Sequence, residues 1–301
     1  MQRGIGEFGP IQELIPDWAA VLVALLTQLG DGWFLFLVLV AVYWLHRPKR
    51  AEVAVVAGTV YIGIALYRTL KELFALPRPE EPLVHVELLP RYVQPLYEAT
   101  ALAGGYGFPS GHAVSSTIVY FGLAAALTAG TRRLRYLVAG VLVSVVCFTR
   151  VALGVHYLVD VVAGVALGLA VLGGARVTYA QFRLDRPTMA FSLAVAFGLV
   201  YEWVSGDTQA VLLVGASLGA VGGWQLVLIA REVFVIDERS VASRAVAARI
   251  ALAVVAFAPL VAALDQFGLL TAYAGASAVG FATALVVLVP VLRRPLRAGR
   301  D

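Results

Sequence analysis

The sequence predicts an all-α integral membrane protein, a polytopic bundle of about nine transmembrane helices. Of its 301 residues, 60% are hydrophobic and 14% are charged, whereas roughly 25% charged residues are usual in a soluble domain. The mean hydropathy is +0.86. This composition excludes a soluble enzyme, and the abundance of Val, Leu and Ala excludes a disordered chain.

Nine apolar stretches are long enough to cross about 30 Å of hydrocarbon, which takes about 20 helical residues. They are residues 18–45, 51–70, 110–129, 134–152, 157–175, 188–204, 209–230, 245–264 and 270–292. Gly30, Asp31 and Gly32 interrupt the first stretch, so we expect a surface helix there that leads into a shorter span. The first 17 residues lack a basic start followed by an apolar core, and no cleavable signal peptide is expected. Cys147, the single cysteine, cannot form an intrachain disulfide.

The basic residues predict the orientation of the spans. If the spans alternate sides, most of the 23 Lys and Arg residues fall in one set of loops, at residues 47–50, 132–135, 176–186, 231–249 and 293–300. Basic loops favour the cytoplasmic face. We therefore expect the N-terminus outside the cell membrane and the C-terminus in the cytoplasm.

The longest polar segment, residues 71–108, lies on the predicted outer side. It is rich in Pro, Glu and Tyr, and we expect a partly ordered cap over the outer surface. Beyond residue 187 the chain continues as apolar spans with short connections. We therefore divide it into residues 1–187, which hold the chemistry, and residues 188–301, which add C-terminal transmembrane helices.

The first polar cluster follows the second span. Lys71 and Arg78 stand seven residues apart, and Pro77 and Pro79 flank the arginine. A rigid exit of this kind would direct two cations at one anion. Taken alone, the cluster is also explained by basic side chains that reach the lipid head groups from a helix end.

The second cluster, from Phe108 to His112, opens the third span. Pro109 and Ser110 are good residues for a helix start, and the first N–H groups of a helix attract phosphate. Gly111 would let a ligand approach the backbone closely, and His112 can transfer a proton near neutral pH. The alternative is an ordinary helix cap followed by a packed or solvated histidine.

The third cluster joins the fourth span to the fifth and contains Arg150, His156 and Asp160. The histidine and the aspartate are four residues apart and share a helix face. An aspartate one turn into the bilayer usually has a function. Here it can orient the imidazole so that the other ring nitrogen is free to attack. The alternative is a buried polar pair that packs two helices together.

All three clusters reach the same predicted membrane face. Three cations could therefore surround one oxyanion while two imidazoles approach it, which is the arrangement that phosphoryl transfer requires.

These residues form three motifs, K-x6-RP at 71–79, PSGH at 109–112 and R-x5-H-x3-D at 150–160. In their order and spacing, over about residues 20–180, the sequence resembles the type 2 phosphatidic acid phosphatase family, which also includes vanadium haloperoxidases. The resemblance implies a six-helix phosphatase core, to which this chain adds three C-terminal helices. Thr149 stands where the family's third motif usually has serine, and a hydroxyl is retained.

The resemblance also implies a role for each residue. His156 would attack phosphorus, Asp160 would orient it, and His112 would protonate the leaving group and then activate water. The phosphate oxygens would be held by Lys71, Arg78, Ser110, Gly111 and Arg150. The family's phosphatases use no metal, so neither a metal nor any other cofactor is expected.

The predicted function is hydrolysis of a lipid or isoprenoid phosphate or diphosphate monoester on the outer face, through a phosphohistidine. The expected partners are this substrate and the membrane lipids, with no nucleic acid. A phosphotransferase would carry the same motifs. The alternative from another class is a transporter or channel with a non-catalytic anion site, but the later spans lack the polar path that transport would need.

Overall fold

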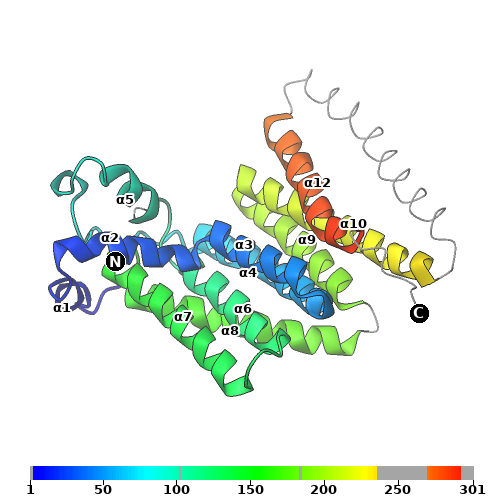
Figure 1. Ribbon diagram of the computed structural model, residues 1–301. Helices are drawn as coiled ribbons and strands as arrows, with labels where there is room; N and C mark the ends of the chain where they lie inside the picture. The colour runs from blue at the N-terminus through cyan, green and yellow to red at the C-terminus, as the bar shows by residue number, and fades with distance from the viewer. Residues whose placement is uncertain (1–2, 102, 183–184, 236–269, 293–301) are drawn as a thin grey trace. The chain divides into compact units, whose positions relative to one another are not determined.

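The protein is all-helical, as predicted, in the part that the computed structural model describes: residues 3–101, 103–182, 185–235 and 270–292 (Figure 1). The chain divides into two units, residues 1–183 and 184–301. The division lies four residues before the predicted boundary.

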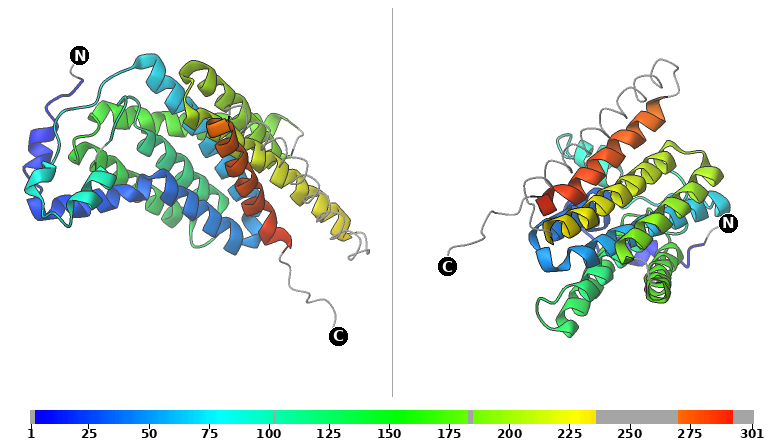
Figure 2. Two further views of the ribbon diagram at one scale, coloured as in Figure 1. Left: turned by 90° about the horizontal axis from the view of Figure 1, so that it is seen from above. Right: turned by 90° about the vertical axis from the view of Figure 1, so that its right-hand side faces the viewer.

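The first unit is built around helix α6 (Gly111–Ala126), which packs against α4 (Arg50–Phe74), α7 (Arg132–Ala152) and α8 (Leu158–Gln181) (Figure 2). Every residue of α6 from 113 to 120 is buried. Two glycines of α8, Gly164 and Gly168, lie directly against α6, and a side chain at either position would meet it at less than 3 Å. Small residues let neighbouring helices approach closely in this way.

The first predicted span is broken at the expected place. It consists of α2 (Ala20–Leu26), the 3₁₀ turn η2 (Thr27–Gly30) and α3 (Gly32–Leu45). Asp31 is extended between them, and the two parts are bent by 51°. The turn η2 packs against α6 and α7, so the break lies beside the core of the unit. The short elements α1 (Phe8–Gln12), η1 (Asp17–Ala19) and η3 (Arg47–Lys49) complete this part of the chain.

The predicted cap between α4 and α6 is partly ordered. It contains the 3₁₀ turn η4 (Val86–Leu88) and α5 (Gln94–Ala101). Val84, Leu89 and Tyr97 are buried in one cluster with Leu153, which follows α7. Apolar packing therefore holds the cap against the turn between α7 and α8.

The second unit contains α9 (Arg186–Ser205), α10 (Thr208–Val235) and α12 (Leu270–Leu292). Helix α10 packs against both of the others. Its contact with α12 is made at Gly215, Gly219 and Gly223, where an added side chain would collide with the α12 backbone. Asp185 caps α9 by accepting hydrogen bonds from the Thr188 backbone and the Trp224 indole.

Six described helices are long and apolar enough to cross a membrane, and the bent pair α2–α3 makes up to seven. The six are Arg47–Phe74, Arg132–Ala152, Leu158–Gln181, Arg186–Ser205, Thr208–Ala230 and Ala272–Val291. Helix α6 has 16 residues, and the predicted span 245–264 lies outside the described residues. The chain is thus a multi-pass membrane protein, and the count of nine spans stays a prediction.

Candidate active site

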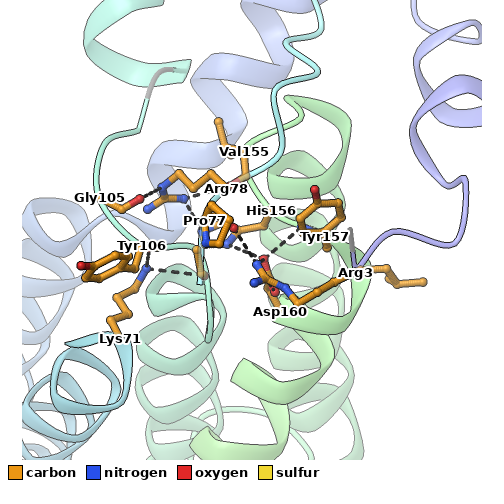
Figure 3. Close-up of polar contacts among 12 residues, drawn as sticks. Arg3, Lys71, Pro77, Arg78, Gly105, Tyr106, Val155, His156, Tyr157 and Asp160 are labelled. Atoms are coloured by element: carbon orange, nitrogen blue, oxygen red, sulfur yellow. Dashed lines mark hydrogen bonds and ion pairs between the residues drawn. The ribbon is translucent and has the colours of Figure 1, made fainter. Parts of the chain in front are cut away.

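The predicted site residues gather at one end of the first unit. Four helix ends meet there: the C-terminal ends of α4 and α7 and the N-terminal ends of α6 and α8. Lys71 lies in the last turn of α4, Arg150 in the last turn of α7, and Asp160 in the first turn of α8. Segments more than 80 residues apart in the sequence thus share one polar cluster (Figure 3).

A tight turn between α7 and α8 presents His156. The carbonyl of Arg150 accepts hydrogen bonds from the backbone N–H groups of Val155 and His156, both at 3.2 Å. Gly154 has a φ of +69°, and a Cβ at this position would lie 1.7 Å from the carbonyl oxygen of Glu81. Only glycine fits this turn, because the cap backbone touches it directly.

The two ring nitrogens of His156 face different partners. Nη1 of Arg78 lies 3.0 Å from Nε2, and Oδ2 of Asp160 lies 3.5 Å from Nδ1. A guanidinium can only donate hydrogen bonds, so Nε2 must accept and the proton of the neutral ring must sit on Nδ1. Nε2 of the imidazole thus accepts from Arg78, while Nδ1 lies near the carboxylate without a hydrogen bond to it.

Burial and the positive charges around it lower the pKa of His156 well below its ordinary value. The charged groups that contribute are, in decreasing order, Arg150, Arg78, Lys71 and His112. His156 is therefore neutral at pH 7.

Backbone carbonyls hold the two cations of the first motif. Arg78 donates through Nε to Gly104 (3.0 Å) and Gly105 (3.1 Å) and through Nη1 to Val155 (2.9 Å). Burial lowers the pKa of Arg78, although the charge of Asp160 opposes the shift. Lys71 donates to the carbonyl oxygens of Tyr106 and Gly107. The loop that precedes the second motif thus fixes both cations of the first.

Ser110 occupies the N-cap position of α6 without capping it. Its side chain makes no capping hydrogen bond, is fully buried, and has no partner for Oγ among the described residues. A buried hydroxyl without a partner is costly. A side-chain cap of α6 therefore does not account for this residue.

The other residues of the second motif pack tightly. A Cβ at Gly111 would lie 2.7 Å from the Tyr67 ring, so glycine at this position is also required for packing. His112 lies beside Gly30, at the break in the first span. A Cβ added to Gly30 would be 3.2 Å from Cδ2 of His112.

Arg150 is almost fully buried, with 2% of its surface exposed. Its Nη1 donates to Oγ1 of Thr27 at 2.9 Å. Thr149, which replaces the usual serine, donates to the carbonyl oxygen of Val146. The broken first span therefore orients the cation of the third motif.

Sequence reasoning missed four residues at this site: Arg3, Thr27, Gly30 and Gly107. The Gly30-Asp31-Gly32 interruption signalled a break but not its contact with the site. Arg3 stood out only as one of the few basic residues on the predicted outer side. No local pattern links residue 3 to residue 160, and only the fold brings them together.

A cavity of about 490 Å³ lies beside Arg78. Its lining is mainly apolar and comes from the cap and from the turn between α7 and α8: Pro79, Pro82, Tyr97, Ala101, Ala103, Gly104, Leu153, Gly154 and Val155, with Arg78 itself. Among the described residues, no three His, Cys, Asp or Glu side chains are grouped as metal ligands. Arg78 is the charged residue of this lining.

Comparison with known proteins identifies the family. The family model of the PAP2 superfamily matches residues 52–184, which include all three motifs. Decaprenylphosphoryl-5-phosphoribose phosphatase of Mycobacterium tuberculosis is 32% identical over 152 residues, which are 48% of this chain and 73% of that protein. Phosphatidylglycerophosphatase B of Bacillus subtilis is 32% identical over 111 residues, 35% of this chain but only 46% of the relative.

Among solved structures, the first transmembrane PAP2-type phosphatidylglycerolphosphate phosphatase from Bacillus subtilis is similar at 24% identity, with a TM-score of 0.43. The match covers 56% of this chain and 83% of that chain. The matching regions stop short of α9, α10 and α12 in the family model. From the three motifs, the family match and the mycobacterial relative, we conclude that the chain belongs to the PAP2 superfamily.

Proposed function

We propose that this protein is a membrane phosphatase that hydrolyses a lipid or isoprenoid phosphate or diphosphate monoester through a phosphohistidine on His156. The observation that carries the proposal is the environment of this imidazole. Nε2 is unprotonated and faces Arg78, while Nδ1 faces Asp160. This is the arrangement of a nucleophile with an orienting carboxylate behind it.

The phosphate would lie between His156 and the cations. Lys71, Arg78 and Arg150 would neutralise its equatorial oxygens, and the hydroxyl of Ser110 would donate to one of them. Positive groups already in place at the developing charge are the main source of stabilisation in such reactions. We therefore propose hydrolysis without a metal ion.

The reaction would take two steps. In the first, Nε2 of His156 forms a bond to phosphorus as the bond to the alkoxide oxygen breaks, and His112 gives that oxygen a proton. The Nδ1 proton of the positively charged ring would be stabilised by Asp160. In the second, His112 takes a proton from a water molecule, the water oxygen attacks phosphorus, and the N–P bond breaks to release phosphate and restore the imidazole.

Three observations favour a lipid substrate. The site lies at the ends of apolar helices, so an acyl or prenyl chain can stay in the bilayer while the head group reaches the cations. The cavity beside Arg78 offers mainly apolar walls for the part of the substrate next to the phosphate. The named relatives are phosphatases of phosphatidylglycerophosphate and of decaprenylphosphoryl-5-phosphoribose.

The distribution of basic loops favours a site on the outer face of the membrane.

The test is phosphate release by the purified full-length chain in detergent. The panel contains phosphatidylglycerophosphate, phosphatidic acid, prenyl phosphates and diphosphates, and a soluble sugar phosphate. We expect turnover of at least one lipid-linked substrate and none by His156→Ala, with His85→Ala, an exposed histidine of the cap, as the matched control. Appearance of the phosphate on an added alcohol would identify a phosphotransferase. No reaction with any member would contradict the proposal.

A further inference from the structure

Arg3 forms an ion pair with the buried carboxylate of Asp160. Its Nη2 lies 3.3 Å from Oδ1 and 3.4 Å from Oδ2. The side chains of Arg3 and Asp160 are 13% and 0% exposed. A buried carboxylate needs a compensating positive charge. Among the described Lys and Arg residues, only Arg3 forms an ion pair with Asp160. Figure 3 shows the arginine reaching Asp160 from the side opposite His156.

The same guanidinium links two motifs. Nη2 also donates a hydrogen bond of 2.8 Å to the carbonyl oxygen of Pro77, which directly precedes Arg78. The guanidinium carbon stands 5.0 Å from the centroid of the Tyr157 ring, a cation–π distance. A Cβ at Gly107 would lie 3.1–3.2 Å from the Pro77 oxygen, Nη2 of Arg3 and Oδ2 of Asp160. Glycine at position 107 thus leaves the space that the guanidinium uses.

Further contacts hold the segment that carries Arg3. Glu7 accepts a hydrogen bond of 3.0 Å from the backbone N–H of Leu158, the first residue of α8, and another from Ile5. Burial alone would raise the pKa of Glu7, but these and other backbone N–H groups outweigh it and lower the pKa. Gln12 donates to the carbonyl oxygens of Glu81 and Ala152. The segment is therefore anchored on both sides of the turn that presents His156.

We propose that Arg3 is a positioning residue of this active site, which acts through Asp160 by holding its carboxylate against Nδ1 of His156 and tying it to the backbone of the first motif. The inference rests on the proposed function, because it assigns Arg3 to that reaction. In the described part of the chain, Arg3 contacts Asp160, the Pro77 carbonyl and the Tyr157 ring, none of which is assigned to the phosphate. It should therefore affect the rate of attack more than the binding of substrate.

The experiment measures kcat and KM of Arg3→Gln and Arg3→Lys in the full chain, with Arg91→Gln, an exposed arginine of the cap, as the matched control. We expect kcat of Arg3→Gln to fall about 10- to 100-fold, by analogy with the loss of an outer-shell partner that orients a metal-binding side chain, with KM little changed. Arg3→Lys keeps a positive charge and should recover part of the loss. The control should behave as the wild type.

A double variant separates positioning from general stabilisation. If Arg3 acts through Asp160, then Arg3→Gln combined with Asp160→Asn should be no slower than Asp160→Asn alone, because the two residues form one unit. The inference would be overturned if the losses in kcat of the two single variants multiplied in the double variant, or if Arg3→Gln left kcat unchanged. Either result would leave the phosphatase assignment intact. If instead the wild type and the Arg91→Gln control release no phosphate from any substrate, the proposed function itself fails.

Discussion

The backbone N–H of Ser110 donates a hydrogen bond of 2.9 Å to the carbonyl oxygen of Asp160. This bond joins the start of α6 to the first turn of α8 and sets the distance between the second motif and the third. Gly164, one turn further along α8, lies against the carbonyl of the same serine. The close packing of the two helices is therefore part of what aligns the site.

Replacement of Gly164 by alanine should misalign the site without removing any of its functional groups. The new Cβ would lie 2.7 Å from the Ser110 carbonyl oxygen and 2.8 Å from Cβ of Ala113, so α6 and α8 must move apart. A misplacement of about 1 Å can cost about 100-fold in rate, and we expect a loss of this size in kcat/KM. Gly173→Ala on the same helix is the control, because nothing lies within 4 Å of its added Cβ. Equal activity of the two variants would show that the packing does not align the motifs.

Replacement of the two histidines should reduce turnover to different extents. His156→Ala should abolish turnover, because no other group can form the covalent bond. His112→Ala should slow turnover by about 10²- to 10⁴-fold, the range for the loss of a general acid. Rapid quenching with radiolabelled substrate should trap an acid-labile, base-stable phosphoenzyme in the wild type and none in His156→Ala. Measurable turnover by His156→Ala would refute the nucleophile assignment.

Asp160→Asn should preserve the fold and impair the attack. The asparagine oxygen can still accept the hydrogen bond that Oδ2 receives from the Tyr157 backbone at 3.1 Å. With the oxygen in that position, the NH2 group takes the place of Oδ1 beside Nη2 of Arg3, and the variant lacks the negative charge that would stabilise the positively charged ring of His156. We expect a loss of up to about 10⁴-fold in kcat with little change in melting temperature. A variant that keeps wild-type kcat would show that Asp160 serves only to cap α8.

How much of this site the sequence could predict depends on the range of each interaction. Periodicity and length predicted the helices. The spacing of His156 and Asp160 predicted that the two side chains meet, at 3.5 Å, but the expected shared helix face is wrong, because His156 lies in the turn before α8. The broken first span was visible at Gly30, because glycines flank a polar residue there. The contacts of Thr27 with Arg150 and of Arg3 with Asp160 span more than 100 residues. They depend on how the helices pack, which no local pattern encodes.

Removal of divalent metals should leave activity unchanged. In the proposed mechanism, Lys71, Arg78 and Arg150 supply the positive charge that a metal would otherwise provide. We expect full phosphate release in excess EDTA and inhibition by vanadate, which adopts the five-coordinate geometry of phosphorus in the transition state. Activity that disappears in EDTA and returns with added Mg²⁺ or Mn²⁺ would require a different mechanism.

The orientation of the site can be tested with single cysteines. Cys147 is the only native cysteine, so Cys147→Ala provides a background without thiols. Arg91 in the cap and Arg133 at the start of α7 are both exposed, and the excess of basic residues around Arg133 favours the cytoplasmic side for it. A membrane-impermeant maleimide added to intact cells should therefore label Arg91→Cys but label Arg133→Cys only after the cells are permeabilised. The reverse pattern would place the phosphate site in the cytoplasm, and a substrate would then have to be sought in the inner leaflet.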